Sequence, residues 1–430
     1  MERKDVPGAP WTVWGTAELC CWIGHFPYAM PTGNDAAECL EAHLKAGIRH
    51  VVWALGRGVV EFHSSSPDVT VRGFNSHDEP LTVQQRAVNR MFREKCQLRA
   101  ALSYADEHGI TLYGRLTMNR HYSPGSIHRS RFATLNPQWC EIRKDGWLDP
   151  SRLSYAVPQY REERLNITME AVRIGCHGIQ LDFCRQPPIA RYHPTYVNVF
   201  EKERGVDPRR LGLEDGELFL EWCRFRAASI TQFVRRLKDE LNAYELWFDR
   251  RVPLQVRVPN DGFVSNLIAG LDVVGWVEEG LVDELALSEL QWLAEFNDFS
   301  DVPYVELGGK HGIPVFASSN CLPVQQDGWS GQVNPKGVNP LVLARRALQS
   351  AKDGAQGIAL YQSDTGVRWP DLAPFLPSFH DPDGLARLIE DLEADERYAV
   401  TEENARYGID NHSRPGAFFA SKTADPRSGV

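Results

Sequence analysis

The residues best suited to chemistry lie in the segment 178–188, where a short apolar run ends in Asp182 and Arg185 follows. Strands buried on both faces read as near-continuous apolar runs. A charged group inside such a run is costly, so a carboxylate belongs at the strand's end, where a loop begins. In a parallel α/β barrel, that end of the strands carries the active site. If the rest of the chain predicts such a barrel, Asp182 is the first candidate for a catalytic residue.

Polar residues follow the other apolar runs in the same way. The candidates at these predicted strand ends are Arg57, Glu61, Arg115, Asn119, His121, Asp182, Arg185, Arg257, Asn260, Asp261, Glu289, Asn320, Gln362 and Asp364. Glycoside hydrolysis needs such a set, because one carboxylate must attack or activate water while a second, protonated carboxyl group protonates the leaving oxygen. The Arg, Asn, His and Gln side chains, together with Asp364, would bind the sugar.

Different residues suit the two carboxyl roles. Asp182 suits the ionised role, because a nearby guanidinium such as that of Arg185 favours the charged form of a carboxylate. Glu289 precedes the apolar segment 290–293, so desolvation would keep it neutral as a proton donor. Asp261 is the alternative donor, because it follows the strand next to that of Asp182. The sequence leaves the choice between Glu289 and Asp261 open.

Each of these residues also has a structural interpretation. An Asp or Glu at a strand end often starts the next helix or pairs with a neighbouring Arg, and the arginines could form a ring of salt bridges that touches no substrate. Cys184 lies beside the predicted site without an evident base partner, so we interpret it as a packed thiol. An aldolase- or lyase-type barrel usually uses a strand-end lysine or a metal cluster. No lysine stands among the candidates, which argues against that class.

Apolar runs alternate with longer helical patterns, which predicts βαβ units and a parallel sheet. The predicted strands lie within 11–24 and at 49–55, 110–118, 177–183, 253–258, 282–288, 311–317 and 357–361. The main helical patterns cover 35–46, 82–107, 158–174, 217–241, 263–279, 340–353 and 382–396. We therefore predict a single-domain (β/α)₈ TIM barrel over residues 1–400, with long loop insertions after the third and fourth strands. Residues 401–430 are predicted to form a polar tail, partly disordered or packed on the barrel.

Composition limits the partners. The chain has 430 residues, 43% of them hydrophobic, and a net charge of −10, which argues against nucleic acid and anionic membranes as partners. Nine scattered cysteines and the lack of a signal-peptide pattern at the start predict reduced thiols in a cytoplasmic protein. We expect no metal site and no cofactor. The oligomeric state is open, and a tryptophan-rich surface is the feature that would support a homo-oligomer.

Two segments resemble motifs of the glycosyl-hydrolase-like family ten, a group of predicted TIM-barrel glycosidases distantly related to the α-galactosidase and α-amylase superfamilies. In the first, Pro158 and Arg161 match the family's pattern and His177 replaces its usual acidic residue before Gly178. The second is the segment 276–285, and the resemblance covers roughly residues 110–365. It implies that Asp182 occupies the position of the nucleophile of related retaining glycosidases. It also implies an acid after the fifth or sixth strand, where Asp261 and Glu289 stand.

The sequence thus predicts a glycoside hydrolase that cleaves O-glycosidic bonds in an oligo- or polysaccharide, with a retaining mechanism favoured. The two carboxyl groups of a retaining enzyme lie about 5–5.5 Å apart, against roughly 6.5–9.5 Å in an inverting one. The alternative is a carbohydrate-binding barrel without catalytic activity.

Overall fold

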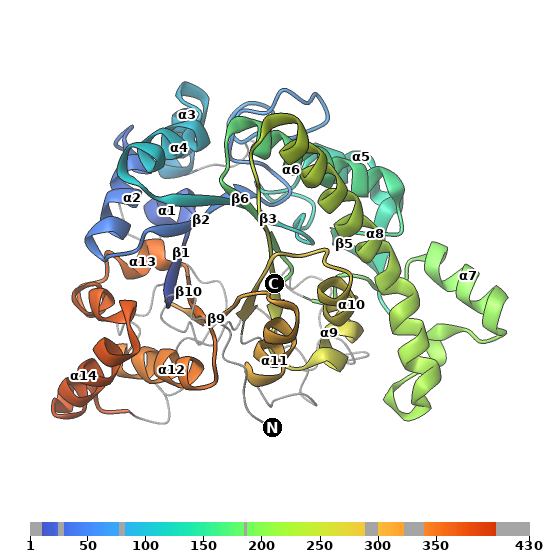
Figure 1. Cartoon of the computed structure of the whole chain (residues 1–430). Helices are drawn as coiled ribbons and strands as arrows, with labels where there is room; N and C mark the ends of the chain where they lie inside the picture. Colours follow the sequence, from blue (N-terminus) through green and yellow to red (C-terminus); the bar gives the residue numbers. More distant parts are fainter. Residues whose placement is uncertain are drawn as a thin grey trace.

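The computed structural model describes residues 11–24, 30–76, 82–184, 187–288, 300–321 and 339–400. Parallel strands close into a barrel in the order β1-β10-β9-β8-β7-β6-β3-β2, which confirms the predicted (β/α)₈ fold (Figure 1). The barrel strands are β1 Thr12–Ala17, β2 His50–Gly56, β3 Thr111–Thr117, β6 Gly178–Asp182, β7 Leu254–Pro259, β8 Glu284–Ser288, β9 Val315–Asn320 and β10 Gly357–Tyr361.

Helices surround this barrel and cover its outer face (Figure 1). They are α2 Asp35–Lys45, α3 Val83–Glu94, α4 Gln97–His108, α6 Pro158–Ile174, α8 Glu217–Phe248, α9 Phe263–Ala269, α10 Val273–Glu278, α11 Val302–His311, α12 Pro340–Lys352 and α14 Pro382–Glu393. Shorter helices, α1 Leu19–Gly24 and α13 Ser363–Gly366, directly follow the strands β1 and β10. No helix in the described ranges is long and apolar enough to cross a membrane.

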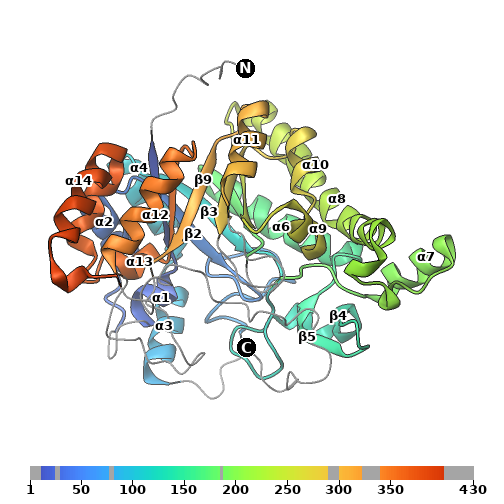
Figure 2. The same ribbon diagram turned by 90° about the horizontal axis from the view of Figure 1, so that it is seen from below.

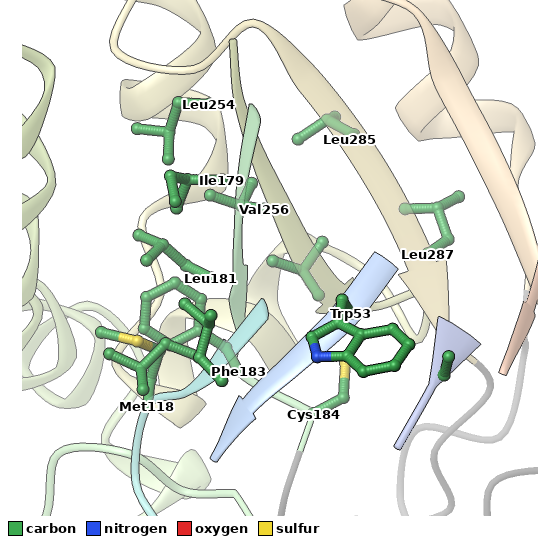
Figure 3. Close-up of a cluster of buried hydrophobic side chains, with 14 of the residues drawn as sticks. Trp53, Met118, Ile179, Leu181, Phe183, Cys184, Leu254, Val256, Leu285 and Leu287 are labelled. Atoms are coloured by element: carbon green, nitrogen blue, oxygen red, sulfur yellow. The ribbon is translucent and has the colours of Figure 1, made fainter. Parts of the chain in front are cut away.

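Alternation along each strand divides its side chains between two environments. Ile179 and Leu181 of β6 belong to the main apolar core with Leu254 and Val256 of β7, and Figure 3 shows these residues beside Leu285 and Leu287 of β8. A second, smaller cluster combines side chains from five strands of the closed ring, which places it inside the barrel. Its members are Trp14, Val52, Tyr113, Phe316 and Ala359.

Several element boundaries differ from the prediction. The helical pattern at 82–107 forms two helices, because Lys95 and Cys96 have extended backbones between α3 and α4. The pattern at 263–279 also divides in two, with Gly270 in the left-handed region at φ 94°. His311 ends α11 instead of starting a strand, and β9 begins at Val315.

The insertions after β3 and β6 are structured. The first contains α5 Arg131–Leu135 and a two-stranded antiparallel sheet, β4 Cys140–Ile142 with β5 Leu148–Leu153, where the sequence indicated only loops. The second contains α7 Pro194–Arg204 before α8. Figure 2 shows the start of β1 at the top and the sheet β4–β5 with α1 and α3 toward the opposite end of the molecule. These segments therefore surround the carboxyl ends of the barrel strands.

Candidate functional site

Side chains alternate between the two faces of each strand, so some polar residues near the strand ends face the barrel interior at its carboxyl end. Arg115 lies two residues beyond Tyr113, which belongs to the interior cluster, so both point inward. Asp182 and Arg257 are direct neighbours in the register of β6 and β7. These three residues lie in one hydrogen-bonded network.

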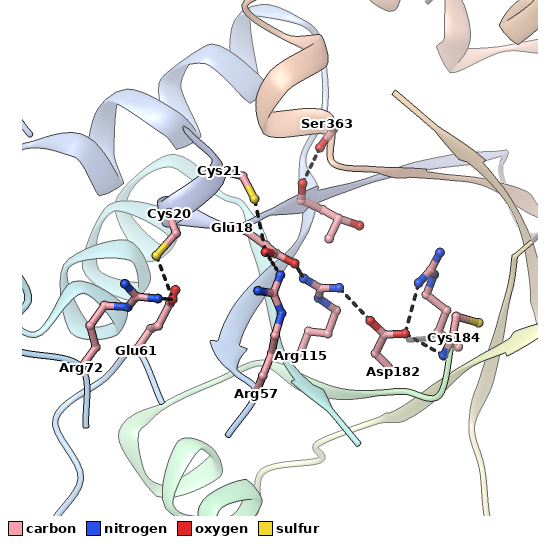
Figure 4. Close-up of polar contacts among 12 residues, drawn as sticks. Glu18, Cys20, Cys21, Arg57, Glu61, Arg72, Arg115, Asp182, Cys184 and Ser363 are labelled. Carbon is pink, nitrogen blue, oxygen red and sulfur yellow. Dashed lines mark hydrogen bonds and ion pairs between the residues drawn. The ribbon is translucent and has the colours of Figure 1, made fainter. Parts of the chain in front are cut away.

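Asp182 is held by donors from two neighbouring strands (Figure 4). Its Oδ2 accepts a hydrogen bond from Arg115 Nη1 at 2.8 Å, and its Oδ1 accepts from Arg257 Nη1 at 3.1 Å. The backbone N–H of Cys184 donates to Oδ1 at 3.0 Å. Asp182 has no exposed surface. Two guanidinium groups thus keep this buried carboxylate ionised.

Glu18 forms the other side of the network and was missed in the sequence (Figure 4). Arg115 Nη2 donates to Glu18 Oε1, and Arg57 Nη2 donates to Oε2 at 2.5 Å. Arg57 Nη1 also donates to the hydroxyl of Tyr122 at 2.7 Å. The available signal was position, because Glu18 is the first charged residue after the apolar run 12–17. We placed the first strand only within 11–24, so its exit was not identified.

Tyr361, the last residue of β10, packs against both central arginines. The guanidinium carbon of Arg257 lies 4.1 Å from the centre of the Tyr361 ring, and that of Arg115 lies 5.3 Å from it. An aromatic face attracts cations at such distances. Arg257 also donates to Ser288 Oγ at 2.5 Å, so its guanidinium is fixed by contacts from β6, β8 and β10.

Asp364 is a third buried carboxyl group near this network. It is fully buried in α13, directly after β10. Burial raises the pKa of Asp364 well above its ordinary value, and the negative charge of Glu18 raises it further. The positive charge of Arg115 and the backbone amides of Glu18 and Thr365 act in the opposite direction. Burial therefore favours the protonated, neutral form of Asp364.

A second ion pair adjoins this network (Figure 4). Arg72 Nη2 lies 3.0 Å from Glu61 Oε1, and the thiol of Cys20 donates to the same oxygen at 2.8 Å. Arg72 also contacts His128 Nδ1 at 2.9 Å. Burial, followed by the charges of Arg72 and other arginines, holds the pKa of His128 well below its usual range. Of these residues, only Glu61 was a candidate from the sequence.

The structure places the remaining candidates in other contacts. Asp261 accepts a hydrogen bond from Ser265 Oγ at 2.7 Å, and Asn260 Nδ2 donates to Asp301 Oδ1 at 2.9 Å. The ring of His121 is buried, with Nε2 2.8 Å from the hydroxyl of Tyr160. None of these contacts joins the network around Arg115.

Burial lowers the pKa of His121, and the positive charges of Arg164 and Arg129 lower it further. The ring is therefore a neutral part of the packed insertion. Asn119 and Gln362 are buried beyond the ends of β3 and β10. Glu289, Arg185 and the side chain of Asn320 lie outside the described residues. Within the described part of the chain, no three His, Cys, Asp or Glu side chains are arranged to hold a metal ion.

Comparison with solved structures finds other barrels. The α-L-fucosidase isoenzyme 2 from Paenibacillus thiaminolyticus has a TM-score of 0.54 and 14% sequence identity, over 90% of this chain and 50% of that one. A β-galactosidase from Rahnella sp. R3 has a TM-score of 0.50 and 12% identity, over 90% of this chain and 57% of that one. The chain thus spans about half the length of these two proteins.

At such identities the likeness shows the fold alone. No family model matches the chain, and neither does any curated protein. The resemblance to the glycosyl-hydrolase-like family ten therefore stays a prediction.

Proposed function

We propose that the chain is a glycoside hydrolase that cleaves O-glycosidic bonds in an oligo- or polysaccharide. The observation that carries this proposal is the network at the carboxyl end of the barrel, where Arg115 pairs with both Glu18 and Asp182 and the carboxyl group of Asp364 is buried nearby. Glycoside hydrolysis needs an ionised and a protonated carboxyl group together. Ion pairing supplies the ionised state of Asp182, and burial supplies the protonated state of Asp364.

In this proposal Asp182 is the nucleophile of a retaining mechanism. Its carboxylate would attack the anomeric carbon, and a separate carboxyl group would protonate the leaving oxygen. The proton donors predicted from the sequence are Asp261 and Glu289. The substrate is a carbohydrate, and this chemistry needs no cofactor.

A carbohydrate-binding barrel without turnover is the second candidate, and one observation favours it. Asp182 has no exposed surface, and three donors occupy its two oxygens. A carboxylate in that state organises the arginines around it. Barrels of one fold support many functions, so the fold does not choose between the two candidates.

A panel of nitrophenyl glycosides distinguishes them, with Asp182→Asn as the test variant. We expect the wild type to release nitrophenol from at least one member and the variant to lose this activity, by at least about 100-fold. Binding of the corresponding free sugar, measured by calorimetry, should persist in the variant. A wild type that binds sugars and hydrolyses none would support the binding barrel. A wild type that neither binds nor hydrolyses would contradict both.

Asp283→Asn is the matched control. Asp283 also pairs with two cations, Lys238 at 2.7 Å and Arg251 at 3.1 Å, but it precedes β8 and so lies at the amino end of the barrel. Its loss should leave hydrolysis unchanged. Circular dichroism of both variants checks that each is folded.

A further inference from the structure

Three arginines lie around Tyr122 at the carboxyl end of the barrel. Arg57 Nη1 donates to the Tyr122 hydroxyl at 2.7 Å, and its guanidinium carbon lies 5.9 Å from the centre of the ring. The guanidinium carbon of Arg120 lies 4.4 Å from the same centre. Arg72 approaches through His128, whose Nδ1 lies 2.9 Å from Arg72 Nη2 and whose ring centre lies 4.9 Å from that of Tyr122. We call these five residues the Tyr122 cluster.

The backbone of Tyr122 is held in an unusual conformation. Its φ is 60°, in the left-handed region that bulky side chains rarely adopt. Its carbonyl oxygen accepts a hydrogen bond from Arg129 Nη1 at 2.7 Å, and the preceding N–H, that of His121, donates to the carbonyl oxygen of Ser151 at 2.8 Å. Strained residues of this kind concentrate at functional sites, where the surrounding structure holds them in place. The fold thus keeps the ring in contact with its two guanidinium groups.

Positive groups outnumber negative ones among the described residues of the cluster and of the adjoining network. The arginines are Arg57, Arg72, Arg115, Arg120 and Arg257. The carboxylates that pair with these arginines in the described ranges are Glu18, Glu61 and Asp182. Burial favours the protonated form of Asp364, and adding its charge would still leave positive charge in excess. Such an excess of guanidinium groups favours an anion as the ligand.

The pKa of His128 reflects the same positive charge. Burial lowers this pKa well below its usual range, and the charges of Arg72, Arg57 and Arg120 lower it further. Glu18 acts in the opposite direction and does not cancel them. Because its ring is neutral, His128 adds no charge of its own, and the positive charge of the cluster comes from its arginines.

The cluster is more accessible to solvent than the centre of the network. The side chain of Arg57 is 13% exposed, and Tyr122 and His128 are half-buried. In contrast, the side chain of Arg115 is 1% exposed and that of Asp182 has no exposed surface. A ligand that arrives from solvent would therefore meet the cluster first.

We propose that the Tyr122 cluster binds an anionic group of the substrate, so that the proposed glycoside hydrolase acts on an acidic saccharide. A carboxylate, sulfate or phosphate group of the sugar would be bound by guanidinium groups, whose planar arrangement of donors matches such anions. Glu18 connects the cluster to the network, because its two oxygens accept from Arg57 and Arg115. The anion would thus be held next to the network that contains Asp182. The inference rests on the proposed function, but the binding can be measured without turnover.

Matched pairs of polysaccharides test the charge of the substrate. Polygalacturonate and its fully methyl-esterified form compare a carboxylate with a neutral group on one backbone. Dextran sulfate with dextran, and phosphomannan with mannan, make the same comparison for sulfate and phosphate. Calorimetry at about 0.15 M salt, which screens distant charges, should find at least one acidic polymer bound about tenfold or more tightly than its neutral partner. The pair that shows this difference identifies the anionic group.

Arg120→Met and Arg120→Lys separate the charge of this residue from its packing. Methionine removes the charge and keeps much of the side chain's length, so the affinity for the acidic polymer should fall about tenfold or more. Lysine keeps the charge and should lose less affinity than methionine. Arg152→Met is the control, because Arg152 is a similarly buried arginine of the same insertion that pairs with Asp149 outside the cluster. It should leave the affinity unchanged, and circular dichroism checks that each variant is folded.

Equal affinity of the wild type for both members of every pair would overturn the inference, and so would a wild type that binds no acidic polymer. Equal losses in Arg120→Met and Arg152→Met would also contradict it. The proposed function fails separately from the inference. Hydrolysis of nitrophenyl glycosides without binding of acidic polymers would keep the function and reject the role of the cluster. Binding of an acidic polymer without hydrolysis of any substrate would keep the role of the cluster and support the binding barrel.

Discussion

Arg115 binds two carboxylates from different strands while almost completely buried, with a side chain that is 1% exposed. Burial is the largest single influence on the pKa of Arg115 and lowers it. The attraction of Glu18, Tyr361 and Asp182 together outweighs burial, so the pKa is raised. A buried charge is tolerated only when it is paired in this way. The guanidinium therefore holds Glu18 and Asp182 ionised within one network.

We expect Arg115→Met to destabilise the protein by about 3–5 kcal/mol, because it leaves two buried carboxylates without their common partner. Urea unfolding followed by fluorescence measures this loss. Arg345→Met is the control, since Arg345 and Glu393 pair at 2.7 Å with both side chains 47% exposed. That change should cost less than about 1 kcal/mol. Similar losses in the two variants would contradict the role of Arg115.

Among the elements, β1 packs closely against its neighbours beside the site. A Cβ added at Gly15 would lie 2.7 Å from Ser363 Oγ and 2.8 Å from a ring carbon of His43. The glycine thus allows α2 and α13 to approach the strand closely. This approach in turn sets the position of the turn before Asp364.

Gly15→Ala should therefore lower stability by about 1–3 kcal/mol, the usual cost of an extra methyl group in a packed core. Thermal denaturation measures the effect. Gly24→Ala is the matched control at the end of α1, because a Cβ there meets nothing within 4 Å. We expect it to change stability by less than about 0.5 kcal/mol. If both variants behave alike, the packing around Gly15 does not constrain β1.

Some elements could be predicted from sequence and others could not. Apolar runs located β6, β7 and β10, because alternation and burial are local properties of a strand. The break between α3 and α4 was missed, since neither Gly nor Pro marks it and Lys95 and Cys96 are compatible with a helix. The sheet β4–β5 was missed because its strands are short and polar.

For the molecule as a whole, the sequence located a polar site but not its pairing. Asp182 and Arg257 were found because parallel strands end at the same edge of the barrel. The partners of Asp182 were not predicted, because Arg115 and Arg257 reach it only through the register of the closed barrel. Sequence proximity had indicated Arg185. Such pairings depend on how strands far apart in the sequence pair when the barrel closes, and no local sequence pattern indicates that pairing.

Two buried groups outside the network give the whole protein opposing pH dependences. Burial lowers the pKa of His43 from 6.5 to about 4, so the unfolded state binds more protons as the pH falls from 6.5 toward 4, and stability declines over that interval. Burial raises the pKa of Glu141 from 4.5 to about 7, with Ser154, Arg191 and Arg226 opposing the shift. The folded state then keeps a proton that the unfolded state loses, so stability declines as the pH rises from 4.5 to 7.

Glu141→Gln isolates the second of these dependences. Glutamine resembles the protonated carboxyl group and cannot ionise. Above pH 7 the folded wild type must either bury a charged Glu141 or keep its proton, and both lower its free energy of unfolding, whereas the variant does neither. From the shift between 4.5 and about 7, we expect it to exceed the wild type by up to about 3 kcal/mol above pH 7. Near pH 4.5 the two should be nearly equal, and urea unfolding at both pH values measures the difference. His43 supplies the internal control, because its decline toward acid should persist in both proteins. A stability difference that does not change with pH would show that Glu141 ionises normally in the folded protein.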